Sequence, residues 1–202
     1  MERYLVRAIT LAVPAVTAFC AFYPYRKRAL DAMKLRSGVL REICMAMFVA
    51  GIAGIIALTV RPVIDKVDWE NQNNDLWGDI ILRIGRHTWT EQTNFVPILP
   101  LFQSDNWSLS HMLINILGNI AMFAPVGFLV SALFRKPGFK RALLTGFALS
   151  LFIEVSQYFT LRVTDINDLI LNTLGSVCGY GIYVIVCKLW PNFAGKLFCH
   201  KL

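Results

Sequence analysis

The sequence predicts an all-α fold, a polytopic membrane helix bundle of about five transmembrane helices, with a long outer loop between helices two and three. Apolar residues make up 56% of the 202 residues and charged residues only 16%, whereas soluble domains average roughly a quarter charged. Five apolar segments come close to the roughly 20 residues that a bilayer core requires. They span residues 4–23, 43–60, 111–134, 142–160 and 166–190.

The first of these segments has two interpretations. Arg3 and Arg7 precede its apolar run, as in a signal peptide. However, no small-x-small cleavage site follows, and the stronger basic cluster lies after the run, so we favour a transmembrane helix. The second segment is short and the fifth begins with acidic residues, which makes the ends of these helices the hardest to place. The five cysteines form no C-x-x-C pair and are interpreted as small packing residues.

The distribution of basic residues predicts the orientation of the chain. Of the 20 Lys and Arg residues, 13 lie in the connections 24–41 and 135–141 or near the C-terminus. The connection 61–110 instead has seven acids and four bases, and 161–168 is also acidic. The positive-inside rule then places the N-terminus outside and the C-terminus in the cytoplasm. This topology accounts for the net charge of +7, which therefore gives no support to a nucleic-acid partner.

Polar side chains inside the apolar segments are the main functional signal. A charged residue in mid-helix costs about 3 kcal/mol on insertion scales, so it normally faces protein or water. Glu154 is the clearest case, because on a continuous helix it would lie about 12 Å from Arg162, toward the bilayer interior. Gln157 shares its face. We expect the amides of Gln157, Asn119 and Asn172 to be the nearest partners of the Glu154 carboxylate.

Two further segments carry polar residues at helical spacing. In the third segment these recur every four positions, at His111, Asn115 and Asn119. In the fifth they share one face with two glycines: Asp168, Asn172, Gly175 and Gly179, with Asp165 close by. The glycines form a small-xxx-small pair that permits close helix packing. If the three polar stripes face one another, they line a polar cleft that opens to the outer surface.

The amide residues also have a purely structural interpretation. Asn115, Asn119, Gln157 and Asn172 could serve only as hydrogen bonds between helices, which are common in membrane bundles. Arg162 would then neutralise Asp165 or Asp168 at the rim of the cleft. A carboxylate as deep as Glu154 requires a partner cation or a proton, and this favours a functional role for it.

Three blocks of the sequence resemble successive blocks of VanZ-like membrane proteins, which are bacterial proteins associated with reduced susceptibility to teicoplanin-type glycopeptide antibiotics. The blocks are TNFVPI, NILGNIAMFAPVGFLV and FIEVSQYFTLRVTDINDLILNTLGSVCGYGIY. The resemblance implies a multi-pass protein of the bacterial cell membrane. It also implies ten polar or structural positions of interest: Asn94, Asn119, Pro125, Glu154, Gln157, Arg162, Asp165, Asp168, Asn172 and Gly175.

On this basis we divide the chain into three parts. Residues 1–89 form an N-terminal two-helix region with a long tryptophan-rich outer loop. Residues 90–190 form a VanZ-like core of three transmembrane helices, and residues 191–202 form a cytoplasmic tail.

Two classes of function follow. In the first, the cleft binds a membrane lipid, a lipid-linked cell-wall component or a lipoglycopeptide. The binding residues would be Asn94, Asn115, Asn119, Gln157, Arg162, Asp165, Asp168 and Asn172. In the second, the protein is an intramembrane enzyme acting on an envelope or polyprenyl-linked lipid, with Glu154 as general acid or base. Asp165 and Asp168 could then hold a divalent cation against a phosphate. A proton-coupled transporter is disfavoured, because the sequence lacks internal repeats.

Overall fold

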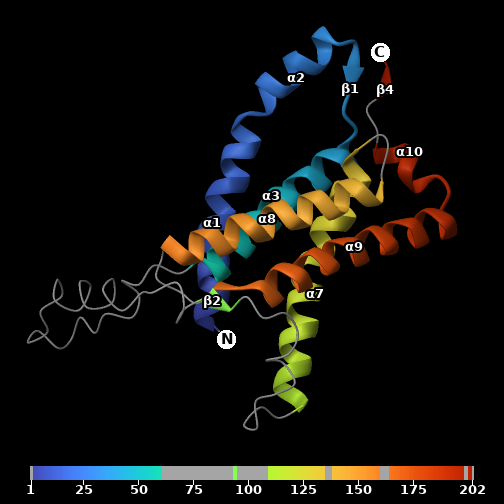
Figure 1. The fold of residues 1–202 in the computed structure, drawn as a ribbon. Coiled ribbons are helices and arrows are strands. Elements are labelled where there is room, and N and C mark those ends of the chain that lie inside the picture. Colours follow the sequence, from blue (N-terminus) through green and yellow to red (C-terminus); the bar gives the residue numbers. More distant parts are fainter. Residues whose placement is uncertain are drawn as a thin grey trace, which may run out of the picture.

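The structure, a computed structural model, describes residues 2–60, 93–94, 109–134, 138–159, 164–197 and 200–201. Its helices are α1 Glu2–Ala21, α2 Tyr23–Ala32, α3 Val39–Thr59, α7 Leu109–Leu133, α8 Phe139–Phe159, α9 Ile166–Leu189 and α10 Phe193–Leu197. Four two-residue strands accompany them: β1 Leu35–Arg36, β2 Thr93–Asn94, β3 Thr164–Asp165 and β4 His200–Lys201. The predicted all-α helix bundle is confirmed (Figure 1).

The described helices include four that are long and apolar enough to cross a membrane, namely α3, α7, α8 and α9. A fifth span results if α1 and α2 are counted as one bent helix, so the prediction of about five spans agrees with the structure. The largest shift in a boundary is at α3, which begins at Val39 rather than at residue 43. The segment that we expected to be short therefore has 21 residues.

The first connection contains a helix that the sequence analysis did not predict. α2 follows α1 after Phe22, and its axis is bent by 42° from that of Ala8–Ala21. Pro24 is the second residue of α2, where its missing N–H costs little, but it cannot donate the hydrogen bond that would continue α1. The bend carries the basic residues Arg26, Lys27 and Arg28 away from the axis of the first apolar segment.

Glycines allow α7 and α9 to pack closely. A Cβ atom on Gly175 would lie 2.6 Å from the backbone oxygen of Ile120. A Cβ atom on Gly179 or on Gly127 would collide with the backbone of the facing helix. The small-residue face predicted for α9 is therefore a contact with α7, because only glycine lets the two backbones approach this far.

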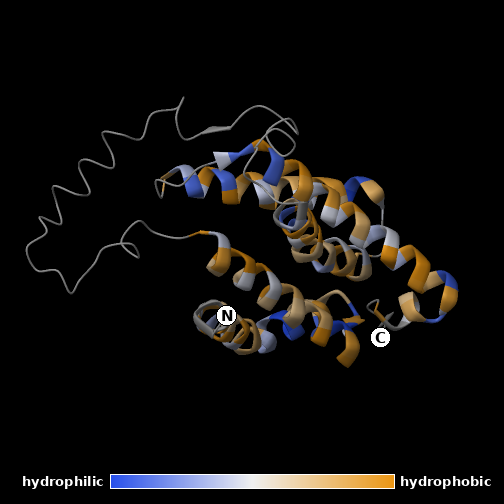
Figure 2. Ribbon diagram, turned by 90° about the horizontal axis from the view of Figure 1, so that it is seen from below, coloured by the Kyte–Doolittle hydropathy of each residue, from blue (hydrophilic) through white to orange (hydrophobic). Residues whose placement is uncertain are grey.

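The long helices divide into two groups, which α3 connects. Ile55 of α3 packs with Phe123 of α7 and Ile153 of α8 in one apolar cluster. α1 packs mainly against α3 rather than against the other helices. Figure 2 shows α1 and α3 on one side and α7, α8 and α9 on the other, with apolar residues predominating along the helices. The second group carries most of the polar residues that the sequence analysis selected.

The connections gather at two opposite ends of the bundle (Figure 1). At the first, which we call the β1–β4 end, β1 pairs with β4, and Arg41 Nη1 donates to the backbone oxygens of Leu133 and Leu197 over 2.8 and 3.2 Å. At the second, the β2–β3 end, β2 pairs in parallel with β3. The described residues that flank the connections predicted to be cytoplasmic thus lie at one end, as Leu133 does beside Arg41, and those that flank the connections predicted to be outside lie at the other, as Asp165 does beside β2. Which end faces the cytoplasm stays a prediction from charge.

Candidate functional site

Glu154 lies on α8 near the β2–β3 end. Its side chain is only 7% exposed. Its Oε2 atom accepts a hydrogen bond from the backbone N–H of Asp165, with 3.0 Å between nitrogen and oxygen. Asp165 immediately precedes α9, so the carboxylate lies at the positive end of the α9 dipole. The structure therefore stabilises the charge of Glu154 through backbone groups.

The structure gives Glu154 a donor that we did not expect. We expected amide side chains as its nearest partners, which stays a prediction, and the structure adds the backbone N–H of Asp165. The expected depth was taken from Arg162, which lies outside the described residues. α8 ends at Phe159, so Glu154 lies about 7.5 Å from that end of its helix, at 1.5 Å per residue.

Asp165 caps α9 and orders the turn beside Glu154. Its Oδ1 atom accepts hydrogen bonds from the backbone N–H of Asn167 over 2.9 Å and from Asn167 Nδ2 over 2.8 Å. This is the usual role of Asp at an N-cap, where a side-chain oxygen satisfies an N–H that has no partner within the helix. The sequence analysis did not select Asn167, which is buried. Its position two residues after a capping residue is the signal that could have identified it.

Asn119 connects α7 with α9. Its Nδ2 atom donates to Asp168 Oδ1 over 2.9 Å, and the same atom lies 3.5 Å from Asn115 Oδ1. Two of the three predicted polar stripes therefore meet as expected. We refer to Asn115, Asn119, Glu154, Asp165, Asn167 and Asp168 together as the polar cluster.

Asn172 belongs to a different contact. Its Nδ2 atom donates to Ser150 Oγ of α8 over 3.0 Å, so the polar face of α9 divides between α7 and α8. Asn172 is 4% exposed, and its Oδ1 atom is buried without a hydrogen bond. One turn further along α9, Ser176 Oγ donates to the backbone oxygen of Ala142 of α8 over 2.7 Å. The sequence analysis missed both serines, because a small hydroxyl residue in an apolar helix also suits simple packing.

Gln157 serves a structural contact. Its Nε2 atom donates to the backbone oxygen of Thr59, the last residue of α3, over 3.1 Å. A side chain that satisfies a carbonyl at a helix end is one of the two roles that the sequence analysis left open for the amides. This contact ties α3 to α8 at the β2–β3 end.

The β2–β3 pairing brings a distant block of sequence to the polar cluster. Asn94 aligns with Asp165, and Thr93 with Thr164, although some 70 residues of chain lie between the strands. The backbone of Asn94 thus lies beside the residue whose N–H binds Glu154. Arg162 lies outside the described residues, as do the side chains of Asn94 and His111. The predicted pairing of Arg162 with Asp165 or Asp168 accordingly stays a prediction.

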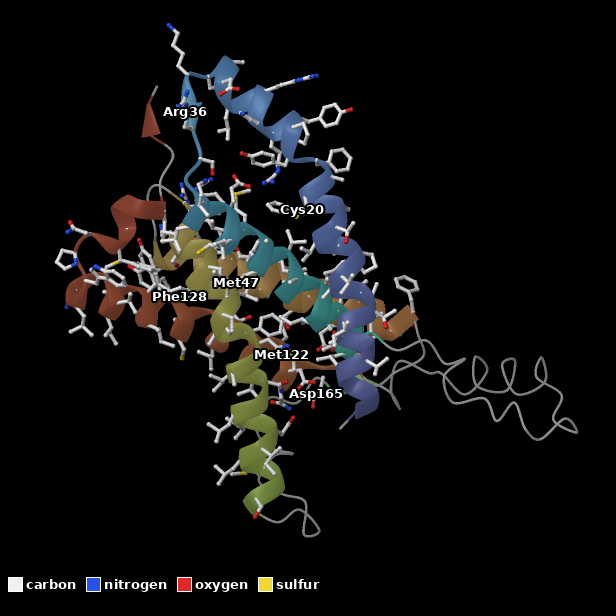
Figure 3. The ribbon with its side chains drawn as sticks, turned by 180° about the vertical axis from the view of Figure 1, so that it is seen from behind. Cys20, Arg36, Met47, Met122, Phe128 and Asp165 are labelled. Atoms are coloured by element: carbon white, nitrogen blue, oxygen red, sulfur yellow. The ribbon has the colours of Figure 1, made fainter. Side chains whose placement is uncertain are left out.

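As far as the structure describes the chain, the polar cluster combines three acids with three amides, and the predicted base Arg162 lies outside the described residues. Figure 3 shows Asp165, one of these acids, at the β2–β3 end. Such a set offers many hydrogen-bond acceptors and negative charge, which suit amine or hydroxyl groups. Within the described parts of the chain, no group of three or more His, Cys, Asp or Glu side chains could hold a metal ion. The described residues therefore provide no third acidic, His or Cys ligand for the divalent cation predicted at Asp165 and Asp168.

Comparison with known proteins relates this arrangement to one family. A curated protein, Protein VanZ of Enterococcus faecium, is 35% identical to this chain over 70 residues, which are 34% of this chain and 44% of that protein. The match thus spans less than half of the length of this relative. No solved structure matches the chain. The family model VanZ/LLP1 matches residues 48–187, from α3 to α9, and so covers the whole polar cluster. The chain is therefore a member of the VanZ/LLP1 family.

Proposed function

We propose that the protein works in the bacterial cell envelope and that its polar cluster binds a group with amine or hydroxyl functions. That group would belong to an envelope lipid, a lipid-linked cell-wall component or a lipoglycopeptide. The supporting observation is the convergence of Glu154, Asp165 and Asp168 at one end of an apolar bundle. Acids in a membrane protein are costly, and they are therefore commonly found where function requires them.

The hydrogen bonds of the cluster hold its acids in position, and this supports a binding role. Glu154 is held by a backbone N–H and Asp168 by Asn119, so both carboxylates have fixed positions. Prearranged acceptors bind a donor group without first paying for their own ordering. The buried Oδ1 atom of Asn172 is a further acceptor near this region, about one turn of α9 beyond Asp168.

The association of VanZ-like proteins with teicoplanin suggests a specific outcome. A teicoplanin-type lipoglycopeptide combines cationic groups with an acyl chain. Acids at the outer end of the bundle would attract the cationic groups. The apolar helix faces would accept the chain. Binding at the membrane would then keep the drug from its cell-wall target, and this protein would lower susceptibility without any chemical reaction.

Glu154→Gln tests this proposal. The substitution keeps the size and one acceptor oxygen of the side chain but removes its charge. We expect it to abolish protection against teicoplanin in a drug-susceptibility assay, with expression and melting temperature close to those of the unsubstituted protein. Ser156→Ala is the matched control, since Ser156 is on the same helix and its Oγ atom donates to the backbone oxygen of Phe152, four residues earlier. Full protection by Glu154→Gln would contradict the proposal.

The same variants separate binding from catalysis. Purified protein is incubated with envelope lipids, with and without Mg²⁺, and the lipids are analysed by mass spectrometry. Saturable binding that Glu154→Gln loses, with no new product, supports the binding function. A product formed by the unsubstituted protein but not by Glu154→Gln would instead identify an intramembrane enzyme with Glu154 as general acid or base.

A further inference from the structure

We propose that the chain has a second binding site, for a phosphate group, in a cavity at the β1–β4 end. The cavity has a volume of about 600 Å³ and lies between α2, β1 and the start of α3. Figure 3 shows Arg36, one of its lining residues, at the opposite end of the molecule from Asp165 of the polar cluster. This site is therefore separate from the proposed function and does not depend on it.

Arg26 is held in a fixed orientation at this cavity. Its Nη2 atom lies 2.9 Å from Glu42 Oε2, and its guanidinium lies 3.6 Å from the centre of the Phe19 ring. The ion pair and the cation–π contact together restrict the side chain from two sides. A guanidinium fixed in this way presents its remaining N–H groups in one direction.

The remaining guanidinium groups and a neighbouring hydroxyl receive no partner from the described residues. Arg26 Nε and Nη1 and Ser37 Oγ are all buried and make no hydrogen bond there. Leaving a buried donor unsatisfied destabilises the protein, and more so when the group is charged. Arg26, Arg36 and Ser37 all line the cavity, so a ligand with several acceptor oxygens would lie among donor residues there. The planar N–H fork of arginine matches the oxygens of a phosphate.

The charges around the cavity also favour an anion. Its lining includes the bases Arg26, Lys27 and Arg36 and the acids Asp31 and Glu42. Glu42 is already paired with Arg26, which leaves Lys27 and Arg36 against Asp31. The excess of positive charge attracts anions, whereas a neutral ligand would gain nothing from it.

The position of the cavity indicates a membrane phospholipid as the source of the phosphate. Large apolar side chains next to it on the chain are strongly exposed: Phe22 at 61%, Tyr25 at 66% and Met33 at 60%. Aromatic residues of this kind are typical of the headgroup region of a bilayer. Basic pockets beside transmembrane helices on the cytoplasmic side commonly hold anionic headgroups, and this end is the one that the charge distribution places in the cytoplasm. A soluble phosphate ester has the same chemistry and is the alternative source.

Native mass spectrometry of the full-length protein tests the proposal. Three probes are compared. Phosphatidylglycerol carries both a phosphate and acyl chains, glycerol phosphate carries the phosphate alone, and diacylglycerol carries the acyl chains alone. The variants are Arg36→Gln and Ser37→Ala, which leave the Arg26–Glu42 pair intact. Arg28→Gln is the matched control, because Arg28 is an exposed base on α2 that does not line the cavity and its loss changes the net charge equally.

We expect phosphatidylglycerol to bind the unsubstituted protein and Arg28→Gln with affinities within about twofold of each other. Arg36→Gln should weaken binding by about tenfold and Ser37→Ala by a few-fold, as for a lost charged and a lost neutral hydrogen bond. Tight binding of glycerol phosphate with the same dependence on Arg36 would also support phosphate recognition, with a soluble ester as the ligand. The proposal is overturned if no phosphate probe binds, if diacylglycerol binds equally well, or if Arg28→Gln weakens binding as much as Arg36→Gln.

Discussion

The three acids of the polar cluster each accept a hydrogen bond from a neutral donor. Asp168 accepts a hydrogen bond from Asn119, Glu154 from the backbone of Asp165, and Asp165 from Asn167. Hydrogen bonds to a carboxylate stabilise its charged form and so offset part of the cost of leaving water. This arrangement uses donors from α7 and from the start of α9, and it therefore depends on the packing of both helices.

The contact between Asn119 and Asp168 should be measurable as a coupling energy. We expect Asn119→Ala and Asp168→Ala each to destabilise the protein by about 1 kcal/mol, because each leaves the other polar group without this partner. The double variant should cost less than the sum of the two, with a coupling of about 0.5–1.5 kcal/mol. Reversible unfolding in mixed detergent micelles gives the four free energies. Strictly additive losses would show that the two side chains do not interact.

At the scale of helices, the packing of α7 against α9 depends on glycine. Gly127, Gly175 and Gly179 each lie where a Cβ atom would meet the backbone of the other helix. In a membrane, lipid tails are as apolar as the helix surfaces, so close van der Waals contact stabilises the association more than apolar burial does. The same contact fixes the rotation of α9 and thereby the direction of Asp168.

Gly175→Leu should accordingly separate α9 from α7. We expect a loss of at least about 1–3 kcal/mol, the usual cost of overpacking a close contact, and a lower melting temperature in detergent. Gly181→Leu is the control on the same helix, because a Cβ atom there has no neighbour within 4 Å. Both substitutions improve helix propensity to the same degree. The difference in melting temperature between the two variants therefore reports the effect of the close contact at Gly175. Equal melting temperatures for the two variants would contradict the close contact at Gly175.

At the scale of the whole molecule, the two ends of the bundle have different chemistry. The β2–β3 end carries the acids of the polar cluster, and the β1–β4 end carries the basic residues of α2 and β1. Arg41 stabilises the β1–β4 end, because it donates hydrogen bonds to the last backbone oxygens of α7 and α10. Such a division is the pattern that the positive-inside rule describes.

Labelling of single cysteines should establish the orientation. In a variant without the five native cysteines, we introduce Pro137→Cys or Asp75→Cys and add a membrane-impermeant thiol reagent to intact cells. We expect position 75 to react and position 137 to react only after the cells are opened, since the basic connection 135–141 is predicted to be cytoplasmic. Labelling of position 137 but not of position 75 in intact cells would show that the chain has the opposite orientation.

The sequence by itself determined the class of fold, the membrane-crossing segments and most of the polar residues at the β2–β3 end. It could do so because a bilayer demands long apolar helices, so each polar exception within them stands out. Only the tertiary structure decided which groups these residues meet. The donor to Glu154 is a backbone N–H, which no residue type reveals, and the partner of Asn172 lies on α8 rather than α7 because the glycines set the rotation of α9. The cavity at Arg26 likewise exists only because α2, bent by 42° from α1, lies beside β1 and the start of α3. This geometry depends on contacts between segments and not on local hydropathy.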